Sequence, residues 1–445
     1  MKFNITIILL ITFFQTSLAQ VSENLPLSAL GIGELSDRGT VAGNSLSGLF
    51  STYYNGYNVN LVNPASYAGL AATAFDVGVD ASYITLDDTR KSQGAWGGNF
   101  KYLSLSFPLI SPVNIVLDRK EQLFKMGMNI SLLPISKMDY RINQTDFTED
   151  NSKVTRQYGG NGGLNKLQFG TGAQYRNFSA GFNVGFLFGT IHNEKALLFE
   201  ELPNGHHTYA VNERAYSGIL WDAGLLYRHF LKKDLENPGK NSWISFGLYG
   251  NSRQPVNVDQ KILTLRKANI YSGLDDANPN QSTIDTISLM SDEGFRNHLP
   301  SRVGFGVSYS ASNRIQMGVN FAFDNWENFN NILNIGELRN SWSAAASMEY
   351  TPDPGSLLDY WNRVSYRGTL YMNSDPRVIQ GDGLDKKGVQ VGLGLPIFQK
   401  RQLSYINFSI DYGKLASQTF KENFIRFNIG VTLNNNLWFY KRRFE

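Results

Sequence analysis

Apolar and polar side chains alternate along most of this sequence, and the alternation begins at Ala74. From Phe75 to Tyr83 the odd-numbered residues are mainly apolar, whereas Asp76, Gly78, Asp80 and Ser82 are small or polar. A period of two predicts a strand with one apolar face. The residues before Asn63-Pro64-Ala65 lack this pattern. The chain therefore divides into a short preamble and a long antiparallel sheet.

About fourteen segments follow as strand candidates. They are 74–85, 99–108, 125–133, 164–176, 178–190, 214–229, 242–252, 300–310, 313–324, 340–351, 361–373, 386–397, 403–414 and 422–434. The clearest is 178–190, where phenylalanine, valine and alanine alternate with glycine, serine and asparagine. Open sheets rarely exceed about ten strands, and a sheet edge in hydrocarbon leaves unpaired amides. This pattern predicts an all-β fold, a transmembrane antiparallel β-barrel of about 14 strands, rather than a soluble sandwich.

The lengths of the predicted connections indicate the orientation of the barrel in the membrane. Every second connection is long and polar: 134–163, 191–213, 253–299 and 325–339. Two of the others, at 176–178 and 311–314, are tight. In outer-membrane barrels the outer loops are long and the periplasmic turns short, so both chain ends are expected on the periplasmic side. Two turns on that side are extended, 111–123 and 351–361, and the second has room for a short helix.

The preamble has two parts. Residues 1–19 have a lysine start, an apolar core and small residues before Gln20, as in a cleaved secretory signal peptide. Residues 20–73 are rich in glycine, serine and asparagine and have too little apolar surface to fold alone. We expect them to be a hatch segment inside the barrel, the alternative being a disordered leader. The barrel is then residues 74–434, followed by a periplasmic tail, 435–445.

Composition narrows the function classes. Charged residues make up only 18% of the chain, aromatic residues 13%, and the net charge is +3, which is too small to indicate nucleic-acid binding. The chain has no cysteine, which excludes disulfides and thiol chemistry. Stability must therefore come from closure of the sheet and from burial.

The residues predicted to face the lumen are small or charged. The small ones are Gly170, Gly172, Gly181, Gly185, Gly304, Gly306, Gly392 and Gly394. They either make room for a plug or a ligand, or relieve curvature at strand bends. The charged candidates are Asp76, Asp80, Arg176, Asp222, Arg228, Glu349, Arg367, Asp411 and Arg426. They either pair with one another and with the hatch, or form a solvated lumen wall.

No motif indicates catalysis, a cofactor or a phosphate site. The five histidines, His192, His206, His207, His229 and His298, fall in predicted loops or near a turn, and none has a convincing serine neighbour. We expect no enzyme activity and no cofactor. Oxygen ligands between Asp275 and Asn280 could bind calcium, but their spacing is irregular. A solvated loop without metal is the expectation.

Several motifs resemble those of the FadL/TodX (OMPP1) outer-membrane transporter family, and in particular its Bacteroidota branch. The Ser28–Gly33 stretch and the Asn63-Pro64-Ala65 junction lie before the first strand, as in the hatch of that family. Further matches are Tyr350–Pro354, Arg363–Gly368, Gly392–Pro396, Asn407–Gly413 and Leu437–Arg443. The resemblance implies a plugged 14-stranded barrel in the outer membrane of a Gram-negative bacterium.

Two functions follow as hypotheses. The resemblance implies passive uptake of small hydrophobic molecules across the outer membrane. The alternative is a non-transporting accessory subunit of an outer-membrane secretion or assembly machine. Its docking surfaces for protein partners would be loop 253–299, turn 111–123 and tail 435–445.

Overall fold

The structure is a computed structural model. It describes residues 25–87, 92–110, 123–147, 152–199, 206–233, 240–268, 274, 283–326, 329, 338–379, 381–399, 402–418 and 420–436. The signal peptide predicted for residues 1–19 lies outside these ranges, as does most of the predicted tail. None of the helices within them is long and apolar enough to cross a membrane.

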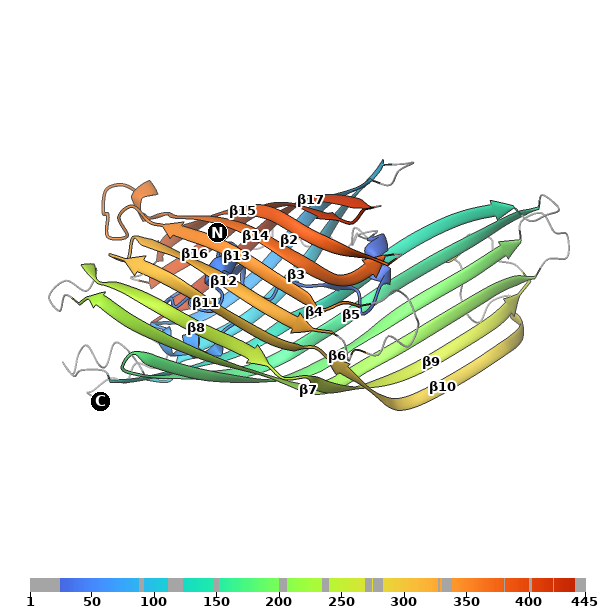
Figure 1. Cartoon of the computed structure of the whole chain (residues 1–445), viewed down its shortest axis with the longest axis horizontal. Coiled ribbons are helices and arrows are strands. Elements are labelled where there is room, and N and C mark those ends of the chain that lie inside the picture. The colour runs from blue at the N-terminus through green and yellow to red at the C-terminus, as the bar shows by residue number, and fades with distance from the viewer. Residues whose placement is uncertain are drawn as a thin grey trace, which may run out of the picture.

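Short elements lead into a series of long strands (Figure 1). The first elements are η1 (Pro26–Ala29), β1 (Glu34–Leu35), α2 (Val41–Asn44), η2 (Ser47–Leu49) and η3 (Pro64–Gly69). The strands are β2 (Thr73–Asp87), β3 (Ser92–Pro108), β4 (Phe124–Phe147), β5 (Lys153–Tyr175), β6 (Phe178–Phe199), β7 (His207–Lys232), β8 (Ser242–Asn251), β9 (Gln254–Lys267), β10 (Thr283–Leu299), β11 (Ser301–Ala311), β12 (Ile315–Asn325), β13 (Ser341–Tyr350), β14 (Ser365–Ile379), β15 (Asp382–Gln399), β16 (Gln402–Ala416) and β17 (Lys421–Asn435). A 3-10 turn, η6 (Trp361–Arg363), precedes β14.

Antiparallel pairing closes the sheet into a ring of fourteen strands, as the sequence predicted. The ring follows chain order from β2 to β8, continues with β11 beside β8, and ends with β17 paired to β2. β9 and β10 form a hairpin above β8 and β11, and β9 pairs with the upper part of β7. Closure satisfies the edge amides of both terminal strands of the ring.

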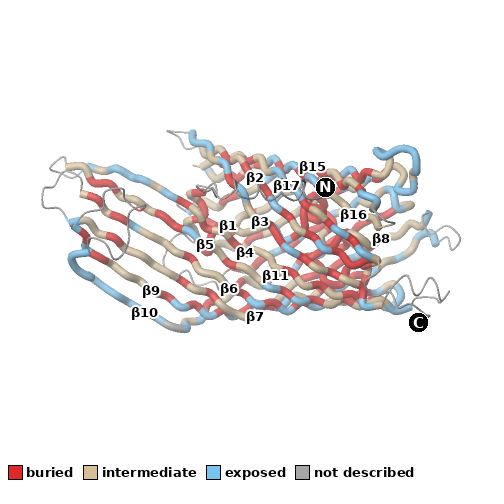
Figure 2. Tube along the Cα trace, turned by 180° about the vertical axis from the view of Figure 1, so that it is seen from behind, coloured by how far each residue is buried: buried red, intermediate tan, exposed pale blue. Residues whose placement is uncertain are grey.

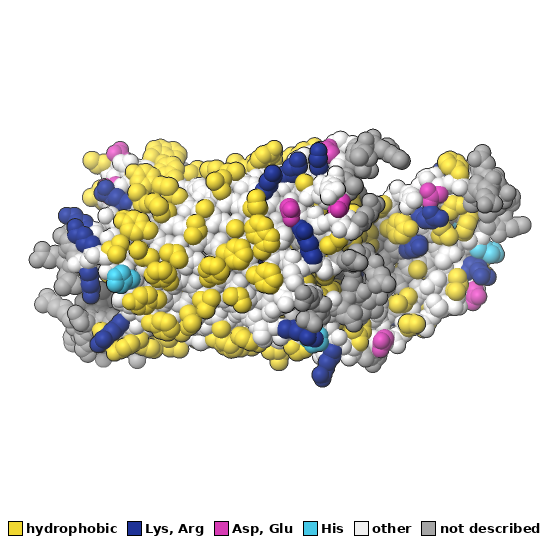
Figure 3. All heavy atoms as spheres, in the orientation of Figure 1, with side chains coloured by type: hydrophobic (Ala, Val, Ile, Leu, Met, Phe, Trp, Pro, Cys, Tyr) yellow, Lys and Arg dark blue, Asp and Glu magenta, His cyan; other side chains and the backbone are white. Residues whose placement is uncertain are grey.

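The two faces of the ring differ in chemistry. On β6, Phe182, Val184 and Phe186 point outward and are exposed, whereas Ser179 and Asn183 point inward and are buried. Figure 3 shows the outcome on one side of the molecule, where apolar side chains cover the barrel wall and charged ones gather towards its ends. A closed barrel with an apolar outer belt is the form in which a sheet can cross a bilayer.

The two ends of the barrel are unequal. Tight turns at Arg176–Asn177 and 312–314 lie at one end, here called the turn end, in agreement with the prediction. At the opposite end, the tall end, one side of the wall continues far beyond the rest (Figure 1). This extension comprises 135–147 of β4, 153–165 of β5, 189–199 of β6, 207–217 of β7, and the β9–β10 hairpin.

The extension corrects the prediction of long polar loops at 134–163, 191–213 and 253–299. Those segments are mostly strand, and only short stretches within them lie outside the described residues. The alternation is hard to see in the sequence for a local reason. Gly162, Gly163 and Gly189 adopt positive φ at the level where the β4–β5 register slips, near Ile135. The bulge in β4 interrupts the period of two.

The wall also has a seam on the side of β4. β3 and β4 pair only from Leu103–Leu132 to Pro108–Gly127. Above that level β3 stays with β2, whereas β4 leans away with β5 (Figure 1). Two strand edges with unpaired backbone groups would remain at the seam unless another segment filled it.

Residues 25–72, here called the plug, fill the barrel interior. Most of their residues are buried, and Figure 2 shows buried stretches, in red, both inside the barrel and along its wall. Val41, Leu46, Leu49, Tyr53 and Tyr67 of the plug are almost entirely buried. The described part of the segment is therefore packed against the inner wall of the barrel.

Candidate functional site: the plugged lumen

The Asn63-Pro64-Ala65 turn is held in a cradle of wall glycines. A Cβ at Gly172 or Gly181 would overlap Pro64, one at Gly127 would overlap the Tyr67 carbonyl, and one at Gly224 would overlap the Asn63 side chain. Any other residue there would therefore displace the turn. Among the glycines predicted to face inward, Gly170, Gly306 and Gly392 also meet plug atoms, whereas Gly185, Gly304 and Gly394 meet side chains of the wall.

Each residue of this turn has a specific role. The Asn63 side-chain oxygen accepts the Ala65 N–H at 3.0 Å and so caps η3, where Pro64 occupies the first position. The Asn63 amide group donates to the Ser51 carbonyl at 2.6 Å and to the Leu225 carbonyl of β7 at 3.2 Å. The motif thus joins two parts of the plug to the wall.

The plug also closes the seam beside β4. Glu34 and Leu35 of β1 pair antiparallel with Lys137 and Ser136. The hydrogen bonds continue on both sides, from Leu25 N–H to the Asp139 carbonyl and from Ser36 N–H to the Ile135 carbonyl, both at 2.9 Å. The plug therefore supplies the neighbour that β3 does not offer to β4 at this height, and it satisfies backbone groups of that edge.

An ion cluster fixes the end of this plug strand. Asp37 accepts from Lys101 Nζ at 2.8 Å and lies 3.4 Å from Arg426, which also lies 3.4 Å from Glu34 and 3.6 Å from Asp80. Enclosure in the lumen raises the pKa of Asp37, but the positive charges of Lys101 and Arg426 lower it more. The net effect is a pKa well below the usual range, so the carboxylate stays ionised in mild acid.

Other predicted inward charges pair across the wall. Arg367 Nε donates to Glu349 at 2.7 Å, and Tyr371 donates to Asp411 at 2.7 Å. Asp222 accepts from Lys166 Nζ at 2.8 Å.

Two more of the predicted charges touch the plug through aromatic rings. The Arg228 guanidinium lies 3.9 Å from the ring centre of Tyr54. Asp76 accepts from the Tyr102 hydroxyl at 2.9 Å, and that hydroxyl accepts the N–H of Val41 at 3.0 Å.

One predicted lumen residue lies elsewhere. Arg176 sits in the β5–β6 turn with a φ of 53°, is exposed, and faces the ring of Tyr175. The assignment failed because the alternation was carried one residue past the end of the strand. Four charged partners were also missed: Glu34, Asp37, Lys101 and Lys166. An isolated charge on the polar face of a membrane strand, as at Lys101 and Lys166, is the signal that could have revealed two of them.

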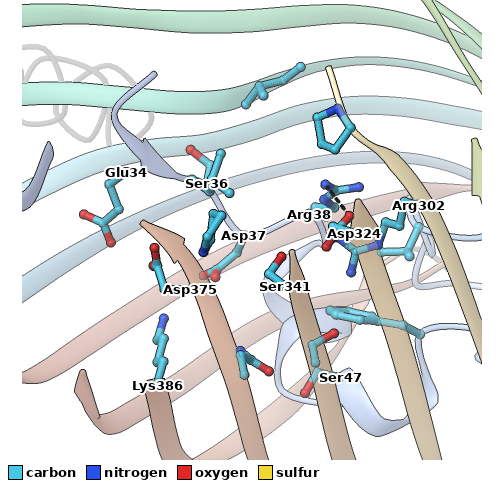
Figure 4. Close-up of a pocket in the computed structure, with 18 of the residues that line it drawn as sticks. Glu34, Ser36, Asp37, Arg38, Ser47, Arg302, Asp324, Ser341, Asp375 and Lys386 are labelled. Atoms are coloured by element: carbon cyan, nitrogen blue, oxygen red, sulfur yellow. Dashed lines mark hydrogen bonds and ion pairs between the residues drawn. The ribbon is translucent and has the colours of Figure 1, made fainter. Parts of the chain in front are cut away.

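A cavity of about 330 Å³ remains between the plug and the tall end. Figure 4 shows its walls, with Arg38 and Arg302 beside Asp324 on one side and Glu34, Asp37 and Lys386 on the other. Arg302 and Arg38 lie 3.2 Å and 3.6 Å from Asp324. Apolar side chains line the cavity as well, among them Ile32, Leu220 and Trp326, so its walls are mixed rather than ionic throughout.

Above this cavity the extension packs onto the plug. Ile32 of the plug joins a buried apolar cluster with Leu187 and Ile191 of β6 and Val258 of β9. Trp326, which follows β12, is part of the same cluster and packs edge-on against Phe329, with ring centres 5.8 Å apart. The extension is thus attached to the plug by an apolar core of its own.

Comparison with known families identifies the chain. The family model described as BamG matches residues 1–445, the whole length. The chain belongs to the BamG family. No curated protein matches its sequence. Among solved structures, the Pseudomonas putida toluene transporter TodX is similar in fold, with a TM-score of 0.50 and 12% identity over 91% of this chain and 99% of TodX.

A second solved structure, the CymD monoaromatic hydrocarbon channel, gives a TM-score of 0.43 at 11% identity, over 84% of this chain and 91% of that one. At such identities the likeness concerns the fold alone. The resemblance to FadL/TodX proteins noted in the sequence holds at the level of the barrel fold, while the BamG family carries a distinct name.

Proposed function

We propose that this BamG-family barrel is a non-transporting subunit of a protein assembly or secretion machine in the outer membrane, with its turn end towards the periplasm. The observation that carries the proposal is the seam. In a barrel of this architecture, a hydrophobic molecule leaving the lumen sideways needs a gap in the wall, and here β1 of the plug occupies the gap along β4.

Two further features support a structural role. The glycine cradle leaves the plug turn no space to shift without breaking contacts to four strands, β4 to β7. The matching family, BamG, also has a name distinct from that of the transporter family that the sequence resembles.

The proposed docking surface is β10, which lies within the segment 253–299 that the sequence analysis expected to be a docking loop. Ile284, Ile287, Leu289 and Met290 of β10 are all exposed, at 49–62%. β10 lies at the margin of the extension and is pale blue along much of its length in Figure 2. Apolar side chains on both faces of one exposed strand are a large cost in water and are typical of a contact surface. Turn 111–123 and tail 435–445 remain proposed contacts, and nearly all of both lies outside the described residues.

Affinity purification in a mild detergent tests this proposal. We expect stoichiometric partner proteins, and their loss in the double variant Ile287→Asn/Leu289→Asn. The matched control, Ser288→Asn/Ser291→Asn, changes the same strand without removing apolar surface and should retain the partners. Recovery of the chain alone, from membranes that contain the folded barrel, would contradict the assembly role.

Passive uptake of a small hydrophobic solute is the second candidate, and the fold shared with the toluene transporter TodX favours it. If uptake is the function, intact cells should accumulate a solute such as toluene faster with this barrel than without it. Deleting residues 22–60 should then raise the single-channel conductance in planar bilayers. Unchanged conductance on deletion would show that the segment does not block the lumen.

A further inference from the structure

The connection between β13 and β14 carries an exposed apolar knob at the turn end, residues 357–361. The exposed fraction is 92% for Leu357, 96% for Leu358, 38% for Tyr360 and 64% for Trp361. Single exposed leucines are common and need no explanation. Four large apolar side chains within five consecutive residues do need one, because water exposure of this surface costs free energy.

Hydrogen bonds hold the knob in a defined shape. The Asp353 N–H donates to the Asn362 carbonyl at 2.8 Å, which closes the base of the connection. The Asp359 N–H donates to Ser356 Oγ, and the Asn362 amide group donates to the Asp359 carboxylate, both at 3.2 Å. The leucines are therefore presented by a folded segment, which reduces the entropy lost on burial.

The knob adjoins the apolar belt of the barrel. The Tyr366 hydroxyl, on the outward face of β14, donates to the Trp361 carbonyl at 3.2 Å. The Arg363 guanidinium lies over the rings of Tyr360 and Phe398, at 5.4 Å and 5.0 Å, and Phe398 is itself 55% exposed. In Figure 1 this segment, in orange, stands out from the turn end of the wall.

We propose that the knob inserts into the phospholipid leaflet at the turn end of the barrel. Its apolar surface continues the lipid-facing belt through Tyr366 and Phe398, whereas a protein docking site would be set off by a polar rim. Aromatic rings beside a cation are the side chains that favour the bilayer interface. No carboxylate within the described residues pairs with Arg363, which leaves this cation to lipid phosphate. The Asp353 carboxylate is instead 3.8 Å from Arg314.

Single-cysteine fluorescence tests the proposal without background, since the chain has no cysteine. Leu358→Cys is labelled with bimane and the full-length barrel is reconstituted in phosphatidylethanolamine–phosphatidylglycerol vesicles. Val184→Cys on the lipid belt and Gln144→Cys on the exposed end of β4 are the lipid and water references. Because Leu358 is almost fully exposed, its replacement should leave folding intact, which gel migration with and without heating verifies.

We expect shallow lipid-attached nitroxides to quench the label at 358 strongly, and iodide to quench it several-fold less than at 144. Leu357→Ser should raise iodide quenching at 358 in the same vesicles, since it weakens insertion. Iodide quenching at 358 equal to that at 144 would overturn the proposal. If the label were then shielded only in native membranes, the knob would be a protein-docking site instead.

Discussion

The lower and upper halves of β6 bury different kinds of side chain. From Phe178 to Phe188 the inward residues are small or polar except for Leu187, and the other large apolar residues point outward and are exposed. Above Gly189, Ile191 is buried against the plug, and Ala196 and Leu198 belong to a second buried cluster. The difference shows where the lipid-facing part of the wall ends. In the belt an apolar side chain is stabilised by contact with lipid, whereas in the extension an apolar side chain must be covered by protein.

The comparison also separates two ways of attaching a plug. Within the belt the plug rests on glycines and on ion pairs with Lys101 and Arg426, because the inner wall there is polar. At the level of the extension Ile32 packs into an apolar core. The polar contacts fix the position of the plug in the lumen, and the apolar contacts bury hydrophobic surface of the plug and of the extension. Both kinds of contact make the plug an integral part of the fold.

Among the substitutions, an arginine at Val184 should have the largest effect on assembly of the barrel. It would put a charge on the lipid face near mid-bilayer, at a cost of about 2–4 kcal/mol. Arginine at Gly185 points into the lumen beside Lys166, where its charge stays hydrated. Heat-modifiable gel migration of the folded barrel should therefore be lost for Val184→Arg far more than for Gly185→Arg. Equal tolerance at both sites would contradict the assignment of faces.

In the extension, arginine should be tolerated on the outer face of the strand and not on the inner face, the reverse of the belt. Val258 of β9 is fully buried in the apolar cluster, and its neighbour Asn257 is exposed on the other face. Val258→Arg overpacks that core and should cost about 1–3 kcal/mol, without blocking assembly of the belt. Asn257→Arg should be neutral. Urea-dependent hydrogen exchange of the β9 amides measures both, and equal destabilisation would mean that the extension has no inner core.

Mild acidification should have the smallest effect, on the stability of the plug strand at residues 34–38. The pKa of Asp37 is held below its usual range. The ion cluster therefore stabilises the folded plug fully at pH values above the pKa of Asp37 in the unfolded chain, which is about 4. This stabilisation is lost only as the pH falls below that value towards the folded-state pKa. Hydrogen exchange at residues 34–38 should thus be equally protected at pH 8 and pH 5, after correction for intrinsic rates. Asp37→Asn should speed that exchange slightly, by about 1 kcal/mol or less. Loss of protection at pH 5 would show that the cluster does not hold the strand.

The sequence predicted the belt well and the extension poorly, for one physical reason. In the belt, lipid requires large apolar residues at every outward position, so the alternation is strong, as in 178–190. In the extension the apolar residues are fewer, both faces have some, and bulges in β4 and β10 break the period. Inward charges such as Asp222, Glu349 and Arg367 followed from the period of two. Their partners, and the pairing of β1 with β4, depend on contacts between distant residues that no local pattern contains.

A disulfide between the plug and β4 tests the central statement, that the plug is a fixed part of the wall. Leu35 and Ser136 are directly opposed in the antiparallel pair of β1 and β4, so a Leu35→Cys/Ser136→Cys variant should oxidise readily. The chain has no other cysteine. Single-channel conductance and toluene flux are then measured in the reduced and the oxidised protein. We predict negligible conductance and flux in both states. Flux in the reduced protein that disappears on oxidation would show that the plug moves, and would contradict the account.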